Sequence, residues 1–285
     1  MLSAMRALSA LALLMSFPGM TLAQPPAKVQ VGVCIDVDRL EAAQAAGFDY
    51  LEVPASKVAG LTDEQFQLLR LQVSQLRVPV AAANNFIPAA IKLVGPDIDK
   101  SRQESYVASA FGRLRTLGVS VVVLGSGGAR RVPEGFARGD AFGQLVDFCR
   151  RIAPMAREKG ITIAIEPLRR QETNIINSAR EGLALVKAVD RPEIQLLVDY
   201  YHLAEEGESA DILLEAGRRL VHTHLANPKG RVYPSSPGES NYAPFFRNLC
   251  AIGYAGRLSI EASTPDFAAQ APQSLAMLRR ALACR

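Results

Sequence analysis

The chain has 285 residues, of which 49% are hydrophobic and 21% charged, a balance that excludes an intrinsically disordered protein. The formal net charge is +4 and no run of Lys and Arg exceeds two residues, which argues against nucleic acid as a partner. The length suits one large domain or two small ones. The order of the predicted elements must decide between them.

The N-terminal segment 1–23 has the features of a secretory signal peptide. Arg6 precedes the apolar run 7–17, and small residues at Thr21 and Ala23 fit the positions −3 and −1 of a cleavage site. This run is too short to span a bilayer comfortably, and a buried N-terminal helix is the alternative. We predict export, to the periplasm, with no stable membrane insertion after cleavage. Loss of Arg6 would lower the net charge from +4 to +3.

From residue 29 onward, short apolar runs alternate with amphipathic stretches. Continuous hydrophobic runs such as VSVVVLG and ITIAI are typical of strands that are buried on both faces in a parallel sheet. The predicted strands are Gln30–Asp36, Phe48–Pro54, Val78–Asn84, Val119–Gly125, Ile161–Pro167, Ile194–Asp199, Leu220–Ala226 and Arg257–Ala262.

Each predicted strand is followed by a helical pattern, and several of these patterns end at a glycine that can adopt the left-handed cap. The predicted helices are Asp38–Ala46, Thr62–Leu76, Lys100–Leu117, Ala141–Lys159, Ser178–Val189, Ala210–Arg219, Ala243–Ile252 and Ala268–Ala283. No linker divides the units, and no G-x-G-x-x-G follows the first strand, so a dinucleotide-binding fold has little support. We predict an α/β protein: a single-domain (β/α)₈ TIM barrel over residues 24–285.

The four cysteines lie far apart, at Cys34, Cys149, Cys250 and Cys284, and form no C-x-x-C pair. A zinc knuckle or a redox motif is therefore not predicted. An oxidising compartment allows a disulfide, and Cys250 with Cys284 is the pair to test. Buried free thiols are the alternative.

Ionisable residues occur at the ends of four consecutive predicted strands, where a barrel carries its chemistry. Glu166, Asp199 and Glu261 follow apolar runs, and His222 and His224 lie two residues apart on one side of their strand. Three neighbouring carboxylates would repel one another, and a divalent cation would compensate their charge. Glu166, Asp199, His224 and Glu261 are therefore predicted to bind one metal ion. This donor set suits Mn²⁺, Co²⁺ or Mg²⁺, with Zn²⁺ or Fe²⁺ as further candidates. Salt bridges at strand ends are the alternative.

Four runs in this half of the chain resemble the xylose isomerase-like TIM-barrel superfamily: EPL-x-x-x-E (166–172), VDYYH (198–202), HTH (222–224) and SIE (259–261). They are most similar to its sugar phosphate isomerase/epimerase group, which includes the ketose 3-epimerases and hydroxypyruvate isomerases. The resemblance implies that the four ligands bind one ion, and Mn²⁺ is the first candidate from the donor set. It also implies that Glu166 and Glu261 move protons on opposite sides of the substrate.

The resemblance further implies that His202 and Glu172 contact substrate hydroxyls and that Arg231 assists them. Arg169 departs from the asparagine often found after this EPL run in relatives. Two further strand ends, Glu52 and Asn84, are candidate substrate contacts.

The Gly125–Gly128 turn, with Arg130 and Arg131 close behind, is either an anion site formed by backbone N–H groups or a plain tight turn.

The implied function is an exported metal-dependent sugar isomerase or epimerase that acts on a small-molecule carbohydrate. A carboxylate removes a proton beside a carbonyl that the metal polarises, and the reaction passes through an enediolate. Loss of a β-substituent from the same intermediate would make the protein a keto-sugar or glycoside lyase. Export favours free sugars, keto-sugars or glycosides over phosphate esters.

Two functions of other classes are also considered. A phosphodiesterase of the endonuclease IV type shares the D-x-x-H element at 199–202, but its zinc site needs more histidines than the three present here. A non-catalytic sugar-binding protein could keep the metal only to hold a ligand. The sequence leaves the oligomeric state open, a homo-oligomer included.

Overall fold

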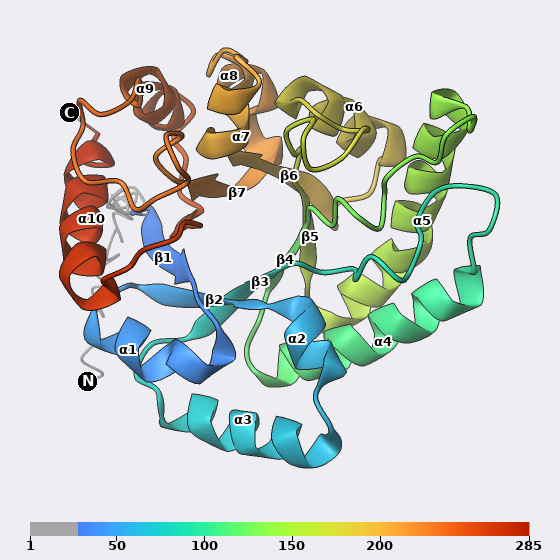
Figure 1. The fold of residues 1–285 in the computed structure, drawn as a ribbon, viewed down its shortest axis with the longest axis horizontal. Coiled ribbons are helices and arrows are strands. Elements are labelled where there is room, and N and C mark those ends of the chain that lie inside the picture. Colours follow the sequence, from blue (N-terminus) through green and yellow to red (C-terminus); the bar gives the residue numbers. More distant parts are fainter. Residues whose placement is uncertain (1–27, 285) are drawn as a thin grey trace, which may run out of the picture.

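Eight parallel strands close into a barrel in their order along the chain in the computed structural model, which describes residues 28–284 (Figure 1). The strands are β1 (Gln30–Cys34), β2 (Tyr50–Pro54), β3 (Val80–Asn84), β4 (Val121–Leu124), β5 (Thr162–Ile165), β6 (Ile194–Asp199), β7 (Leu220–Leu225) and β8 (Arg257–Ile260). The predicted single-domain TIM barrel is confirmed. The predicted signal peptide lies outside the described residues.

Helices surround this barrel on its outer side (Figure 1). They are α1 (Leu40–Ala45), α2 (Ala55–Gly60), α3 (Asp63–Gln75), α4 (Lys100–Thr116), α5 (Arg138–Lys159), α6 (Ala179–Val189), α7 (Tyr200–Glu205), α8 (Ile212–Ala216), α9 (Ala243–Ala251) and α10 (Phe267–Ala281). None of these helices, within the part of the chain that the structure describes, is long and apolar enough to cross a membrane.

The sequence prediction misses two short helices, α2 and α7, that begin directly after a strand. Pro54 ends β2 and Ala55 begins α2, so no polar turn separates the two elements. Likewise, Asp199 ends β6 and caps α7, because its carboxylate accepts a hydrogen bond from the Tyr201 N–H at 2.9 Å. Without a polar turn as a boundary, the sequence pattern shows only the strand.

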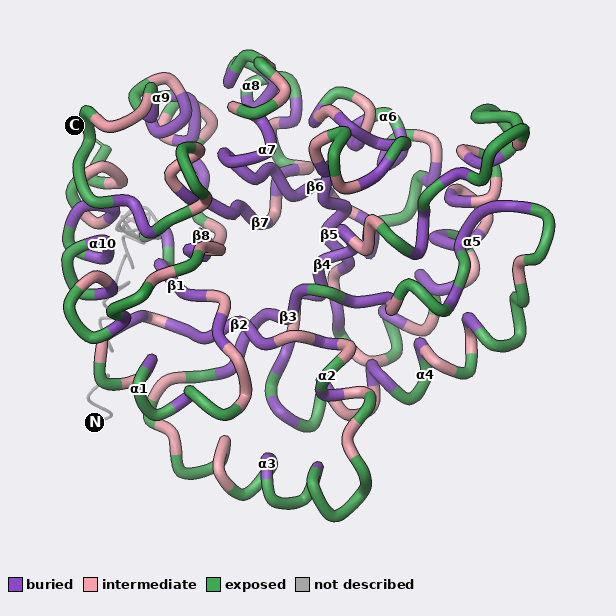
Figure 2. The backbone as a smooth tube through the Cα atoms, in the orientation of Figure 1, coloured by how far each residue is buried: buried purple, intermediate pink, exposed green. Residues whose placement is uncertain are grey.

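Two apolar layers hold the barrel together. The larger one lies between the strands and the helices, and the smaller one lies inside the barrel, where it includes Ala82, Val123 and Ala164. Figure 2 shows the strands buried at the centre and the exposed segments on the outer helices and loops. Above the interior apolar layer, β2, β7 and β8 carry polar side chains that are fully buried: Glu52, His222, His224 and Ser259. These polar residues lie beneath the candidate site.

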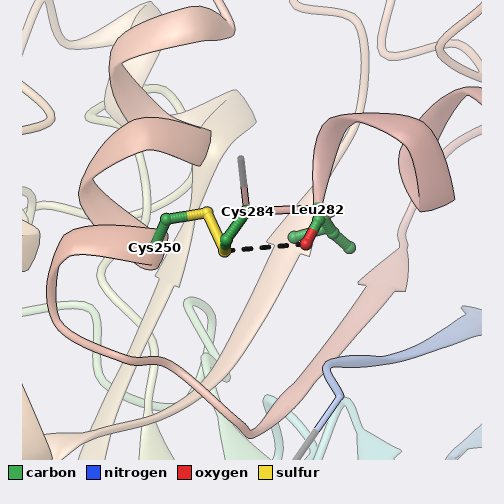
Figure 3. The surroundings of a disulfide bond; sticks show 3 residues. All are labelled: Cys250, Leu282 and Cys284. Carbon is green, nitrogen blue, oxygen red and sulfur yellow. Dashed lines mark hydrogen bonds between the residues drawn. A yellow bond between two sulfur atoms is a disulfide. The ribbon is translucent and has the colours of Figure 1, made fainter. Parts of the chain in front are cut away.

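A disulfide joins Cys250 in α9 to Cys284, which follows α10 (Figure 3). The pair that the sequence singled out for testing is therefore bonded, and the alternative of free thiols does not hold for it. Cys34 and Cys149 remain free thiols within residues 28–284. The bond fixes the end of the last helix against its neighbour, across a sequence separation of 34 residues.

Removal of this disulfide by the double change Cys250→Ser and Cys284→Ser is expected to lower the free energy of unfolding by about 2–4 kcal/mol, because the unfolded chain regains loop entropy. Urea denaturation measures the loss. Dithiothreitol should lower the stability of the wild type by a similar amount and leave that of the double variant unchanged. Equal stabilities of both proteins would contradict the prediction.

Candidate metal centre and active site

The four predicted metal ligands lie together at the carboxyl-terminal end of the barrel. One ligand atom of each of Glu166, Asp199, His224 and Glu261 lies within 4.8 Å of the ligand atoms of the other three. Register explains part of this arrangement, because Asp199 pairs with His224 across β6 and β7. Parallel strands bring their carboxyl ends to one rim, so residues far apart in sequence meet there.

The distances and burial of these groups fit a divalent cation. His224 Nδ1 lies 3.1 Å from Glu166 Oε1 and 3.4 Å from Glu261 Oε2. Asp199 Oδ2 is buried and accepts no hydrogen bond from the described residues. A buried carboxylate oxygen without a donor is costly, and the cost rises beside two further carboxylates. Three carboxylates and one imidazole are also an appropriate donor set for a divalent metal.

The three carboxyl groups differ in their affinity for protons. Burial, together with repulsion from Glu261, raises the pKa of Glu166 and raises the pKa of Asp199 to about 7. Burial alone would also raise the pKa of Glu261, but the charge of His224, its hydrogen bond and the charge of Arg231 outweigh this effect. They lower the pKa of Glu261 to about 2. Glu261 is therefore the most readily ionised of the three.

A buried polar network supports His224 from below. Glu52 is completely buried, and its Oε1 lies 3.0 Å from His224 Nε2. Its Oε2 lies 2.8 Å from His222 Nε2 and accepts a hydrogen bond from Ser259 Oγ at 2.6 Å. When Nε2–H is donated to Glu52, loss of the proton on Nδ1 leaves a lone pair that faces the other ligands, as metal binding requires.

The structure thus places Glu52 beneath the metal ligands, in contrast with its prediction as a substrate contact. Glu52 ends an apolar run, but both of its oxygens are already engaged by buried side chains. The roles of His222 and Ser259 were not predicted. Alternation along β7 indicates that His222 points inward with His224, yet it gives no partner for the ring.

Glu52→Gln is expected to weaken Mn²⁺ binding by about 10–100-fold, because it removes the charge that supports the Nε2–H form of His224. Isothermal titration with Mn²⁺ measures the affinity. Glu41→Gln, at an exposed position of α1, is the matched control and should bind Mn²⁺ as the wild type does. An unchanged affinity in Glu52→Gln would contradict the positioning role.

The other predicted substrate residues surround the metal ligands. Arg231 Nη2 lies 2.6 Å from Glu261 Oε2, and Asn84 Nδ2 donates to Glu261 Oε1 at 2.8 Å. Arg231 Nη1 also lies 3.3 Å from Glu172 Oε1. His202 Nε2 lies 3.7 Å from Asp199 Oδ2 and 4.0 Å from Glu172 Oε2. The structure therefore brings these residues to one site, and their contact with substrate stays a prediction.

Tyr201 is an aromatic platform at this rim that the sequence does not single out. The guanidinium groups of Arg231 and Arg169 lie 4.6 Å and 5.0 Å from the centre of its ring, at a separation typical of cation–π contacts. Arg169 also donates to Glu172 at 3.0 Å. Arg169, the residue that departs from the family pattern, therefore contacts Glu172 directly and shares the Tyr201 ring with Arg231.

The glycine-rich turn after β4 makes room for the site. A Cβ atom at Gly125 would lie 2.3 Å from Glu166 Oε2, so a larger residue would displace this carboxylate. Arg130 is buried and donates to the carbonyl oxygens of Leu124, Glu166 and Ile176. The side chain of Arg130 therefore joins the end of β4 to the segment that follows β5, and these carbonyl oxygens take up its donors in place of an anion.

Above the ligands lies an open cavity of about 510 Å³. Its lining includes Glu166, Glu172, Arg231, Glu261 and the turn 126–128. The volume falls within the range of roughly 300–1,000 Å³ that is usual for small-molecule sites.

Comparison with known proteins agrees with this arrangement. Residues 40–281 match the family model described as xylose isomerase-like TIM barrel. The chain belongs to this family. The resemblance predicted from the four runs at the strand ends is therefore confirmed.

Relatives within the xylose isomerase-like family are sugar epimerases and isomerases. L-ribulose 3-epimerase from Methylomonas sp. (strain DH-1) is 31% identical over 79% of this chain and 77% of that protein. 2-Oxo-tetronate isomerase from Haemophilus influenzae is 26% identical over 79% of this chain and 86% of that protein. The crystal structure of D-allulose 3-epimerase from Methylomonas sp. aligns with a TM-score of 0.79 at 25% identity, covering 90% of this chain and 99% of that one.

Proposed function

We propose that this xylose isomerase-like protein is a divalent-metal-dependent sugar epimerase or isomerase that moves a proton at the carbon beside a ketone. The observation that carries the proposal is the position of two carboxylates, the buried Glu166 and the half-buried Glu261, which both lie within 3.4 Å of His224 Nδ1. Two carboxylates at one small site can serve as acid and base for the same carbon. The 3-epimerase activity in the names of the relatives supports epimerisation.

Glu166, Asp199, His224 and Glu261 would hold the metal. When bound, it would act as a Lewis acid on the sugar ketone and a neighbouring hydroxyl, and so acidify the C–H bond of the carbon that carries this hydroxyl. Asp199 Oδ2, which accepts no hydrogen bond from the described residues, is the atom that most directly supports a bound cation.

The protein's own residues would then move the proton. Glu261 takes the proton from carbon, and Glu166 gives a proton to the opposite face. The reverse reaction exchanges these roles. Arg231 and Asn84 each bond one oxygen of Glu261 and so fix the direction in which that carboxylate points.

Proton–deuterium exchange in D₂O, with Mn²⁺ and a panel of ketoses, tests the proposal. We expect solvent deuterium at one carbon next to the ketone, together with formation of the epimer or the isomeric aldose. Release of a β-substituent would instead identify a lyase acting through the same first step. No exchange with any ketose, with Mn²⁺, Co²⁺ or Mg²⁺ present, would refute enzymatic enolisation and favour a sugar-binding protein.

We also propose that the protein is exported to the periplasm. The segment 1–23 supports this, and the Cys250–Cys284 disulfide fits an oxidising compartment. Expression in a Gram-negative host, followed by fractionation and N-terminal sequencing, tests it. A periplasmic product that begins at Gln24 is expected, and an intact N-terminus in the cytoplasmic fraction would refute export.

A further inference from the structure

A second cavity adjoins the active-site cavity on the side of β2 and β3. It has a volume of about 430 Å³ and shares four lining residues with the first cavity: Asn85, Ser126, Gly127 and Gly128. Its outer wall is formed by the end of β2, the start of α2 and the loop after β3. A substrate bound over the metal-binding residues could therefore extend into the second cavity.

The boundary between the two cavities is fixed by hydrogen bonds. Ser126 Oγ accepts from the Ile87 N–H at 2.9 Å, and the Asn85 carbonyl accepts from the Ser56 N–H at 3.2 Å. Asn85 and Ser126 also have φ angles of 50° and 45°, in the left-handed region that non-glycine residues rarely adopt. These bonds hold the wall in one shape, as expected of a cavity that is formed before its ligand binds.

The lining of the second cavity suits an uncharged sugar unit. The one charged residue among its described lining is Lys57, which is ion-paired with Asp36. Ser56 and Asn85 offer groups for hydroxyls, while Pro54, Ile87 and Pro88 offer an apolar surface for sugar C–H groups. A phosphate would lack an unpaired side-chain cation in this cavity, and Arg130 already donates to backbone carbonyls.

We infer that the substrate is a keto-sugar linked to a second, neutral sugar unit, which binds in this second cavity. The inference rests on the proposed enolisation at the metal site. A single ketose would lie over the ligands and leave the space between Ser56 and Ile87 to water. A keto-disaccharide would fill both cavities.

Deuterium exchange with D-fructose, lactulose, turanose and isomaltulose tests this substrate class. We expect at least one keto-disaccharide to exceed D-fructose in kcat/KM for exchange by about tenfold or more, as filling a pocket typically gives. Ser56→Trp, which fills the second cavity, should lower kcat/KM for that disaccharide by about tenfold more than for D-fructose. Ser74→Trp, at an exposed position of α3 outside both cavities, is the matched control and should alter neither.

Exchange with D-fructose that exceeds exchange with every disaccharide would overturn the inference, as would a Ser56→Trp variant that loses both activities equally. Either result leaves the proposed epimerase standing, because enolisation would still be observed. Absence of exchange with these four sugars and with every other ketose of the panel, in the presence of each metal, would refute the proposed function, and the substrate inference with it. Thermal unfolding of both Trp variants, compared with the wild type, verifies that they are folded.

Discussion

Glu261→Gln is expected to lower kcat for epimerisation by about 10²–10⁴-fold, the usual contribution of a positioned acid or base. The amide retains an oxygen for the metal and keeps the size of the side chain, but it cannot accept the proton from carbon. Measured by chromatography of the two epimers, turnover should fall to near background. Glu158→Gln, at an exposed position of α5, is the matched control and should react as the wild type does.

The same variant separates a two-base mechanism from a one-base mechanism. With Gln at position 261, Glu166 can still remove and return a proton on its own face, so one epimer should take up solvent deuterium without inversion. In Glu166→Gln, Glu261 can still remove and return a proton on its own face, so the other epimer should take up solvent deuterium without inversion. Nuclear magnetic resonance of the sugars in D₂O detects both outcomes. Full epimerisation by either variant would contradict the roles proposed for these two residues.

Mn²⁺ is expected to raise the stability of the chelator-treated protein by about 2.7 kcal/mol at a concentration of 100 times Kd. For a chain of this size the gain corresponds to a Tm increase of roughly 5–10 °C. The physical reason is that the cation binds only where Glu166, Asp199 and Glu261 are brought together, and it replaces their repulsion by attraction. Differential scanning calorimetry with and without Mn²⁺ measures the shift.

Asp199→Asn removes the buried oxygen charge that lacks a hydrogen-bond donor among the described residues. We expect this variant to lose most of the Mn²⁺-dependent increase in Tm and to gain stability in the absence of metal, because one of three mutually repelling carboxylates is gone. Asp97→Asn, at an exposed position, is the control and should keep the full shift. A full shift in Asp199→Asn would argue against a metal at these ligands.

Much of the barrel could be predicted from local pattern, because the strands are buried on both faces and their hydrophobic runs are continuous. The structure shortens most of these runs at one or both ends, as for Ile161–Pro167, of which β5 keeps Thr162–Ile165. Ile161 remains buried without belonging to the strand. Apolar residues thus extend beyond the strand ladder into the turns, so a hydrophobic pattern overestimates strand length.

The metal ligands could also be predicted, because each lies at the end of a strand and consecutive strands are neighbours in the barrel. Their meeting requires only the order of the strands and the common direction of their carboxyl ends. The role of Glu52 could not be predicted in this way. Its bond to His222 joins residues 170 positions apart, across the interior of the closed barrel.

The sequence by itself therefore determined the alternation of strands and helices, the rim on which the ionisable residues gather and the cysteine pair to test. Only the tertiary structure decided which carboxylate faces the cavity and which lies beneath it. It also decided that Tyr201 lies against the guanidinium groups of Arg169 and Arg231, and that a second cavity lies beside the turn 125–128. The physical reason is that hydrophobic periodicity and the order of the strands can be read along the chain, from residues that are close together in sequence. Contacts across the barrel depend instead on its closure and on the packing of every side chain between them.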